Sequence, residues 1–229
     1  LGQNALRDNT TADDNTAVGK NALVLNTTGS PNTAVGKAAL QSNTTGTLNT
    51  AIGKDALNAN TTASANTAVG HAALLLNVTG ESNTAVGSSC LTNNTASNNT
   101  AMGRNALNAN TSGENNTAIG SNTLDLCTTG ARNVAVGSFA MTNSTTAEEN
   151  VAIGQAALES LTTGSQNTAV GQNALKANTS ASNNIAVGRN ALVSNTTGGF
   201  NTAVGRAALD ANTTGAANVA VGDGALGAN

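Results

Sequence analysis

The most informative absences in this sequence are those of aromatic and charged residues. The 229 residues include no tryptophan, no tyrosine and two phenylalanines, and only 9% of them are charged. This composition is neither that of an ordinary globular enzyme nor that of a highly charged disordered chain. With a formal net charge of −3 and no aromatic platforms on which bases could stack, the chain is not expected to bind nucleic acid.

Residues that carry out chemistry are equally scarce. The chain has one histidine and two cysteines, and its carboxylates are scattered, so neither a catalytic set nor a cluster with metal-ligand spacing emerges. We therefore expect no enzyme activity, no cofactor and no metal. No run approaches the ~18 apolar residues of a membrane-spanning helix, and Leu1 lies inside a repeat rather than in a signal sequence, so no membrane insertion of this segment is expected.

What the sequence has in abundance is repetition. A unit of the form NTAVGxxALxxNTTGxx runs through all 229 residues, which predicts a single repeat array that is a segment of a longer fibre protein. The copies are 17 residues long, except for one of 16. When the first asparagine is counted as position 1, the copies begin at Asn15, Asn32, Asn49, Asn66, Asn83, Asn99, Asn116, Asn133, Asn150, Asn167, Asn184, Asn201 and Asn218.

Several positions of the repeat hardly vary. Glycine occupies position 5 in all fourteen copies that include it, alanine occupies position 3 in all thirteen, and leucine occupies position 9 in thirteen of fourteen. The invariant glycine predicts a positive φ angle or a backbone contact too close for a Cβ atom. In the first full copy the structural positions of the repeat are Asn15, Ala17, Val18, Gly19, Leu23, Asn26 and Gly29.

Positions 1 to 5 have the alternation of a short β-strand. Positions 2 and 4 then share one face, which carries threonine and branched apolar residues, and positions 1, 3 and 5 share the other. Neither face carries a charge in any copy, so we expect both to be packed, one against the coil interior and one against another subunit. Positions 12 to 15, usually NTTG, predict a second short strand between tight turns.

These features predict an all-β protein, a parallel β-solenoid or β-roll with one 17-residue coil per repeat and about fourteen coils. Like residues then stack at the ~4.8 Å strand spacing. The residue missing from the short copy falls between Asn93 and Asn98, in a turn, and leaves the face of the next strand unchanged. Cys90 and Cys127 lie two coils apart, too far for a disulfide, and are expected to be free and packed. Because each coil buries little apolar area, side-by-side association is expected.

The motifs NTAVG, NTAIG and NVAIG, followed by xxAL, resemble the head repeats of trimeric autotransporter adhesins of the YadA type. The whole unit NTAVGxxALxxNTTGxx also resembles repeats of adhesive-fibre and phage-tail-fibre-like proteins. This resemblance implies a homotrimer of left-handed parallel β-rolls in an extracellular fibre, with the NTAVG strands near the threefold axis. It also implies a host or matrix surface as the partner.

Two columns of the repeat concentrate charge. Position 6 holds six of the nine basic residues, with His71 in the same column, and positions 16 and 17 hold six of the twelve acidic residues. The basic column is a candidate ridge for binding an anionic polymer or a cell surface, although a solvated outer corner is the simpler interpretation. Its basic members are Lys20, Lys37, Lys54, Arg104, Arg189 and Arg206.

The threonine and asparagine columns support further hypotheses. Threonines at positions 2, 13 and 14 would stack into hydroxyl ladders that resemble the ice-binding faces of solenoid antifreeze proteins. However, some copies carry apolar residues at position 2, such as Val134 and Ile185, which indicates that this position is buried. Packing of the hydroxyls within the sheet is therefore the preferred interpretation. The NTT tripeptides are also glycosylation sequons. Leu161 occupies the position of the sequon asparagine, which indicates that side chains at this position point into the coil. This favours a ladder of stacked asparagine amides over glycosylation. Candidate glycosylation sites are Asn26, Asn43 and Asn60.

Taken together, the residues favour a structural and adhesive module of an extracellular surface fibre, the shaft or head of a trimeric adhesin or of a tail-fibre-like filament. Such a protein needs reach, rigidity and a repeated display surface, and a coil that templates the next coil supplies all three. The alternatives are an ice-binding solenoid that uses stacked threonines and a self-stacking filament subunit.

Overall fold

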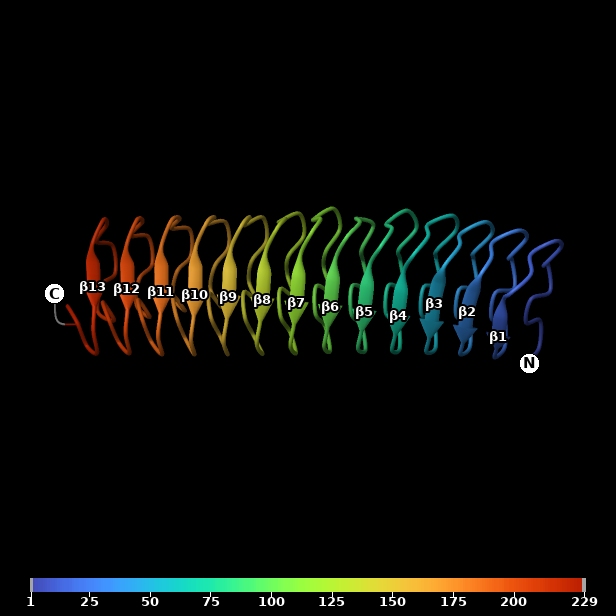
Figure 1. The fold of residues 1–229 in the computed structure, drawn as a ribbon, viewed down its shortest axis with the longest axis horizontal. Coiled ribbons are helices and arrows are strands. Elements are labelled where there is room, and N and C mark those ends of the chain that lie inside the picture. The colour runs from blue at the N-terminus through green and yellow to red at the C-terminus, as the bar shows by residue number, and fades with distance from the viewer. Residues whose placement is uncertain (1, 228–229) are drawn as a thin grey trace. The chain divides into compact units, whose positions relative to one another are not determined.

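The computed structural model describes residues 2–227, which form thirteen short β-strands and the turns between them. Contacts divide the chain into two compact units, Leu1–Asn115 and Asn116–Asn229. The first unit contains β1 (Thr16–Val18), β2 (Asn32–Val35), β3 (Asn49–Ile52), β4 (Thr67–Val69), β5 (Thr84–Val86) and β6 (Thr100–Met102) (Figure 1). The second unit contains β7 (Thr117–Ile119), β8 (Val134–Val136), β9 (Val151–Ile153), β10 (Thr168–Val170), β11 (Ile185–Val187), β12 (Thr202–Val204) and β13 (Val219–Val221).

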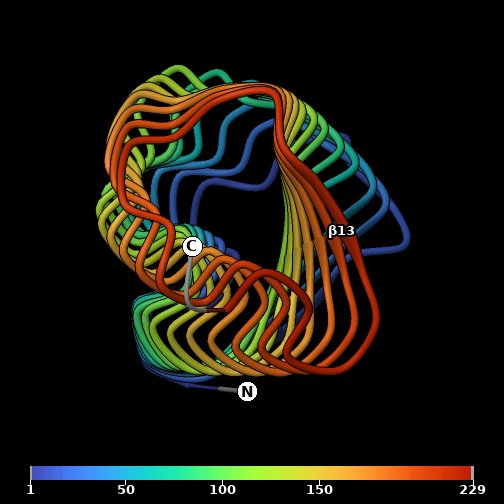
Figure 2. The same ribbon diagram turned by 90° about the vertical axis from the view of Figure 1, so that its left-hand side faces the viewer.

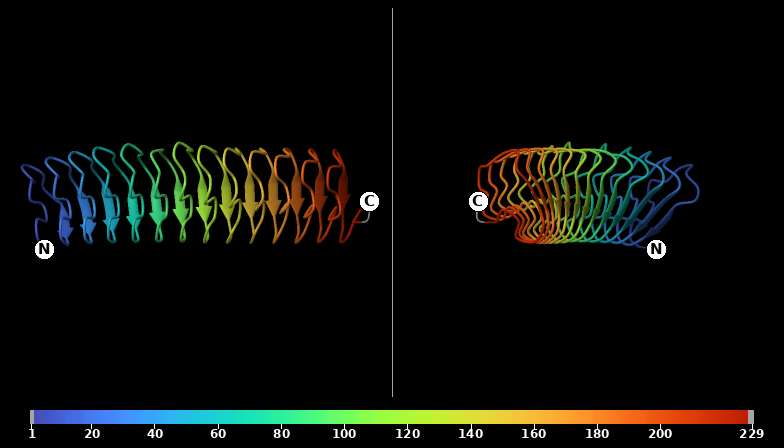
Figure 3. Two further views of the ribbon diagram at one scale, coloured as in Figure 1. Left: turned by 180° about the vertical axis from the view of Figure 1, so that it is seen from behind. Right: turned by 60° about the vertical axis from the view of Figure 1, so that its left-hand side comes forward.

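Within each unit, successive strands pair in parallel and in strict register. Thr33 of β2 lies opposite Thr50 of β3, and the alanines and branched residues of neighbouring strands match in the same way. Each strand therefore lies one repeat away from its neighbour, and Figure 3 shows the strands of each unit side by side from two further directions. The predicted parallel β-solenoid with one coil per 17-residue repeat is confirmed.

The interior of each coil is lined by the columns that vary least in the sequence. Alanines at position 3, such as Ala51, and the Ala-Leu pair at positions 8 and 9, such as Ala56 and Leu57, are completely buried. Figure 2 views the second unit from its C-terminal end, with β13 along one side of the last coil. Leu57 has a φ of 50°, in the left-handed region, as do the other position-9 residues, and this backbone turn directs the side chain inward.

The invariant glycine at position 5 is explained by the closeness of neighbouring coils. Gly53 has a φ of 138°, and a Cβ atom placed on it would lie 2.4 Å from the carbonyl oxygen of Gly70 in the next coil. Both parts of the sequence prediction are therefore confirmed at this position: the angle strongly favours glycine, and the space admits no side chain.

Positions 12 to 15 curl back instead of forming the predicted second strand. The side-chain amide of Asn26, at position 12, donates to the carbonyl oxygen of Gly29 at 3.0 Å, and the amide of Asn15, at position 1, donates to the same oxygen at 2.9 Å. Two asparagines thus hold one carbonyl and bend the segment, so the extended conformation is lost and the prediction of a strand there is wrong.

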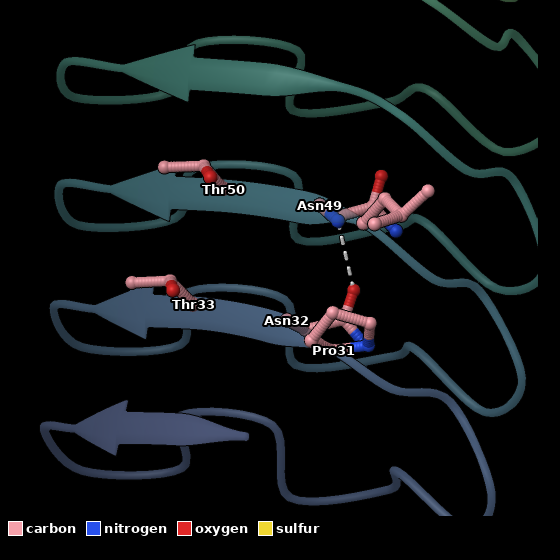
Figure 4. A pocket seen from close by; sticks show the side chains of 6 residues that line it. Pro31, Asn32, Thr33, Asn49 and Thr50 are labelled. Carbon is pink, nitrogen blue, oxygen red and sulfur yellow. Dashed lines mark hydrogen bonds between the residues drawn. The ribbon is translucent and has the colours of Figure 1, made fainter. Parts of the chain in front are cut away.

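The asparagine ladder predicted at position 12 is present. The amide of Asn43 donates to Oδ1 of Asn26 at 2.8 Å, and the amide of Asn60 donates to Oδ1 of Asn43 at 2.9 Å. A second ladder at position 1 was not predicted: the backbone N–H of Asn49 donates to Oδ1 of Asn32 at 3.0 Å (Figure 4). Burying these amides is favourable because each one replaces its water contacts with hydrogen bonds to the next coil.

The 16-residue copy absorbs its deletion as predicted. Asn94 reaches the carbonyl of Ala96 two residues ahead, at 2.7 Å, whereas Asn26 reaches three residues ahead in a full copy. The short turn thus keeps the hydrogen bond from the position-12 asparagine to a carbonyl of the same turn. The strands β5 and β6 remain in register, with Thr84 opposite Thr100.

Candidate interaction surface

The outward face of the strands is formed by positions 2 and 4. Val18, Ile52 and Met102 at position 4 expose 45%, 41% and 47% of their surface, although the alanine between positions 2 and 4 is buried in every strand. The prediction that both strand faces are packed is therefore wrong for the chain by itself. The face that turns inward carries asparagine and alanine, and the outward face carries threonine and branched apolar residues.

The two units differ at position 2 of this face. In the first unit all six strands present threonine, from Thr16 of β1 to Thr100 of β6. In the second unit threonine remains at this position in β7, β10 and β12, and the other four strands carry Val134, Val151, Ile185 and Val219. Ile185 is 44% exposed and Val219 is 68% exposed, so the interpretation of these apolar residues as buried is also corrected.

The threonines fall into two chemically distinct sets. At position 13 the hydroxyl donates to the carbonyl of the equivalent residue in the next coil, as from Thr27 to Thr44 and from Thr44 to Thr61, both at 3.1 Å. Among the described residues, the position-2 hydroxyls, such as those of Thr33 and Thr50, have no hydrogen-bond partner in the protein. The predicted ladder of packed hydroxyls therefore exists at position 13, while position 2 offers its hydroxyls to solvent.

The basic column is brought into register in the first unit. The N–H of Ala38 donates to the carbonyl of Lys20 at 2.9 Å, and that of Asp55 donates to the carbonyl of Lys37 at 2.9 Å, which stacks Lys20, Lys37 and Lys54 in three consecutive coils. All three lysines are exposed, and Lys54 forms an ion pair with Asp55 at 2.9 Å. Exposed ion pairs of this kind contribute little to stability.

The column is discontinuous as a source of positive charge. His71 continues it after Lys54, Ser88 interrupts it, and Arg104 follows on the next coil. In the second unit Arg189 and Arg206 are exposed, and the guanidinium of Arg206 donates to Asp223, in the same column, at 2.7 Å. This hydrogen bond lowers the pKa of Asp223 and leaves Arg206 paired.

Acidic turn residues are solvated, as expected. Asp13 and Asp14 are exposed, and Glu149 accepts hydrogen bonds from Gln166 at 3.1 Å and from Arg132 at 3.0 Å. These two bonds, with that of Gln166 having the larger effect, lower the pKa of the Glu149 carboxyl. The contacts join neighbouring coils at the surface.

The three candidate glycosylation sites are inside the coil. Asn26, Asn43 and Asn60 have no exposed surface, and each amide nitrogen that would carry a glycan already donates to a carbonyl and to the neighbouring asparagine. Attachment of a sugar would require the coil to open. This geometry argues against glycans at these positions in the folded protein.

The two cysteines are free and buried, as predicted. Desolvation raises the pKa of the Cys90 thiol to about 12 and that of the Cys127 thiol to about 11, so both are protonated at neutral pH. Cys127 occupies the asparagine position of its coil, and its thiol lies 3.5 Å from the carbonyl of Gly130. The inward direction predicted from Leu161 is likewise observed, because that side chain is completely buried.

In residues 2–227, no group of three or more histidine, cysteine or acidic side chains is placed to hold a metal ion, and no segment is a helix of the length and apolarity that crossing a bilayer requires. A shallow hollow of about 200 Å³ lies beside β2 and β3, below the ~300 Å³ of typical ligand pockets (Figure 4). It is lined by Pro31, Asn32, Thr33, Leu48, Asn49 and Thr50.

No family model, no curated protein and no solved structure matches this chain.

Proposed function

We propose that this protein is a structural and adhesive module of an extracellular surface fibre, without catalysis, which assembles as a homotrimer of left-handed coils. The observation that carries the proposal is the uncharged, outward sheet face of the second unit, where branched apolar residues occupy both outward positions of several strands. Val134 and Val136 share this face on β8, and Ile185 and Val187 share it on β11.

Exposed apolar residues on a repeated flat face favour association. Ile119, Ile153 and Ile185 expose 37%, 41% and 44% of their surface, and they belong to strands that present no charge. Contiguous apolar surface of this kind is characteristic of an interaction site. Burying it between copies would be worth ~25 cal/mol for each Å² removed from water, which supplements the small interior of each coil.

Rigidity and reach follow from the way coils hold one another. Within each unit, backbone hydrogen bonds link every strand to the next, and the asparagine and position-13 threonine columns add side-chain bonds in the same direction, as from Thr162 to Thr179 at 2.8 Å. Stability in such arrays is approximately a sum over neighbouring coils. A longer fibre therefore needs only more copies of the same coil.

Adhesion is assigned to the surfaces that this assembly leaves exposed. The stacked Lys20, Lys37 and Lys54 of the first unit provide one basic edge, which fits an anionic host or matrix polymer. Because the three charges are exposed, such binding would weaken steeply as the salt concentration rises.

The proposal is tested by light scattering of the purified chain across a dilution series. We expect a mass near three times the 22.2 kDa of one chain. Val151→Lys combined with Ile185→Lys places two charges on the proposed interface, and this variant should be a monomer. The matched control is Thr163→Lys with Thr197→Lys, in the same two coils but at exposed position 14, which should remain a trimer. A wild-type monomer at all concentrations would refute the trimer.

A further inference from the structure

We propose that the outward face of β1 to β6, in the first unit, binds the surface of ice. This activity is separate from fibre assembly, which we assign to the apolar face of the second unit. The proposal rests on three properties of the face: its regular two-dimensional array, its free hydroxyls and its lack of charge.

The array has two rows of side chains in register. Thr33 and Thr50 project to the same side from equivalent points of β2 and β3 (Figure 4), and the pairing repeats from β1 to β6. Branched apolar residues form the second row, two residues further along each strand, with Met102 in place of valine or isoleucine on β6. The spacing is ~4.8 Å between strands and ~6.7 Å along a strand. Exposed faces of ice present an oxygen lattice with repeats of this order, so many side chains can meet the lattice at once.

The hydroxyls of this row are available for a ligand. Among the described residues, the hydroxyls of Thr16, Thr33, Thr50, Thr67 and Thr84 have no partner within the protein, whereas position-13 hydroxyls donate to the next coil, as from Thr44 to Thr61. Both sets are stacked in register, but only the position-13 set joins neighbouring coils by side-chain hydrogen bonds. The position-2 set faces outward.

Free hydroxyls also distinguish ice from a second protein copy as the partner. Packing this face against the apolar face of another protein would remove six hydroxyls from water without supplying acceptors, and burying a hydroxyl without a hydrogen-bond partner is unfavourable. Ordered water offers each hydroxyl both donors and acceptors. The methyl groups of the threonines and of Val18, Val35 and Ile52 then fill the spaces between these bonds without competing for hydrogen bonds.

Other ligands are less compatible with the same face. No acidic or basic residue lies at positions 1 to 5 of any copy, so the face offers no ion pair to a charged polymer. Sugars are bound in proteins by aromatic platforms, and the only two aromatic residues, Phe139 and Phe200, lie in the second unit. A neutral, rigid and periodic partner is the one whose chemistry matches.

The experiment measures thermal hysteresis of the full-length chain and the uptake of its fluorescently labelled form into a growing ice hemisphere. Thr50→Lys combined with Thr67→Lys disrupts the centre of the array. Thr62→Lys combined with Thr79→Lys adds the same charges to the same two coils at exposed position 14, and is the matched control. Circular dichroism melting checks that both variants fold.

We expect the wild type and the control variant to show hysteresis and ice uptake, and the Thr50/Thr67 variant to lose most of both. Absence of hysteresis and of uptake in the wild type overturns the proposal. Equal activity in both double variants overturns it as well, because another surface would then be responsible. If the wild type does not enter ice and the Thr50/Thr67 variant dissociates an oligomer in light scattering, the face is an interface between copies and the proposal fails.

Discussion

Replacement of one ladder asparagine tests how far the amide columns hold the solenoid together. We consider Asn43→Leu, in the middle of the first unit. The side chain of Asn43 is completely buried, and leucine is a suitable replacement because Leu161 already occupies the same position in the second unit. No large cavity is created, so the effect is dominated by lost hydrogen bonds.

Three hydrogen bonds disappear with the Asn43 side chain. Its amide donates to Oδ1 of Asn26 at 2.8 Å and to the carbonyl of Gly46 at 3.0 Å, and its Oδ1 accepts from the amide of Asn60 at 2.9 Å. A buried hydrogen bond contributes about 1 kcal/mol net, so we expect a loss of about 3 kcal/mol. Oδ1 of Asn26 would also be left without a donor, which adds to the loss.

At Leu161 the ladder is already interrupted in the native chain. The residue of the preceding coil that corresponds to Asn26 is Ser144, and its buried Oγ has no hydrogen-bond partner among the described residues. In the first unit, by contrast, Oδ1 of Asn26 accepts from the amide of Asn43 and would lose this donor. Leucine therefore breaks existing hydrogen bonds at position 43, whereas at position 161 the native chain has none of them to lose.

The assay is hydrogen exchange of backbone amides, because neighbouring coils can open locally. The N–H of Thr44 donates to the carbonyl of Thr61 at 2.8 Å and reports on the affected turn. A loss of about 3 kcal/mol should accelerate its exchange by roughly a hundredfold. Thr45→Ala, at an exposed neighbouring residue, is the control and should change stability by less than about 0.5 kcal/mol. If Asn43→Leu exchanges no faster than this control, the ladder does not contribute as we infer.

Three further predictions concern the backbone, the thiols and pH. Gly53→Ala should lower the urea midpoint markedly, because its Cβ would lie 2.4 Å from a carbonyl oxygen of the next coil, and an unchanged midpoint would contradict this. Cys90 and Cys127 should react with a thiol reagent at pH 8 only after urea is added, and rapid labelling of the native protein would refute their burial. The pKa values of Asp223 and Glu149 are lowered in the folded protein, so their stabilisation is present above the ordinary pKa near 4 and is lost as pH falls through the folded values. The melting temperature should therefore be constant from about pH 8 to 5 and fall in stronger acid, and a fall already between pH 7 and 5 would contradict it.

The repeat period and the nature of the fold were determined by the sequence itself. Invariant Gly53 and its equivalents mark where neighbouring backbones come close, and buried Leu57 and its equivalents mark the interior. These residues could be interpreted from the sequence because a 17-residue repeat places equivalent residues of every copy in the same environment. A residue type that recurs at one position of the repeat therefore indicates what that environment requires. The same reasoning placed Leu161 inside the coil and the deleted residue of the short copy in a turn.

Which face of the strand turns inward was decided only by the tertiary structure. Strand alternation separates Thr33 and Val35 from Asn32 and Ala34, but neither pair carries a charge, so the pattern alone does not say which of them is buried. The closure of the coil decides it, because the asparagine at position 1 must reach a carbonyl fourteen residues ahead in its own coil, as Asn32 does to Gly46 at 2.8 Å. Once the asparagines face inward, the position-2 threonines must face outward.

The division of the threonines into bonded and free sets has the same origin. Threonine predominates at both position 2 and position 13 of the repeat. The hydroxyl of Thr44, at position 13, donates to the carbonyl of Thr61, whereas the hydroxyl of Thr50, at position 2, has no hydrogen-bond partner among the described residues. The difference depends on the local direction of the backbone: the asparagine clamp bends positions 12 to 15 so that a carbonyl of the next coil lies within reach of the hydroxyl. On the extended strand the carbonyls lie in the plane of the sheet, and the outward threonine side chains stand perpendicular to it.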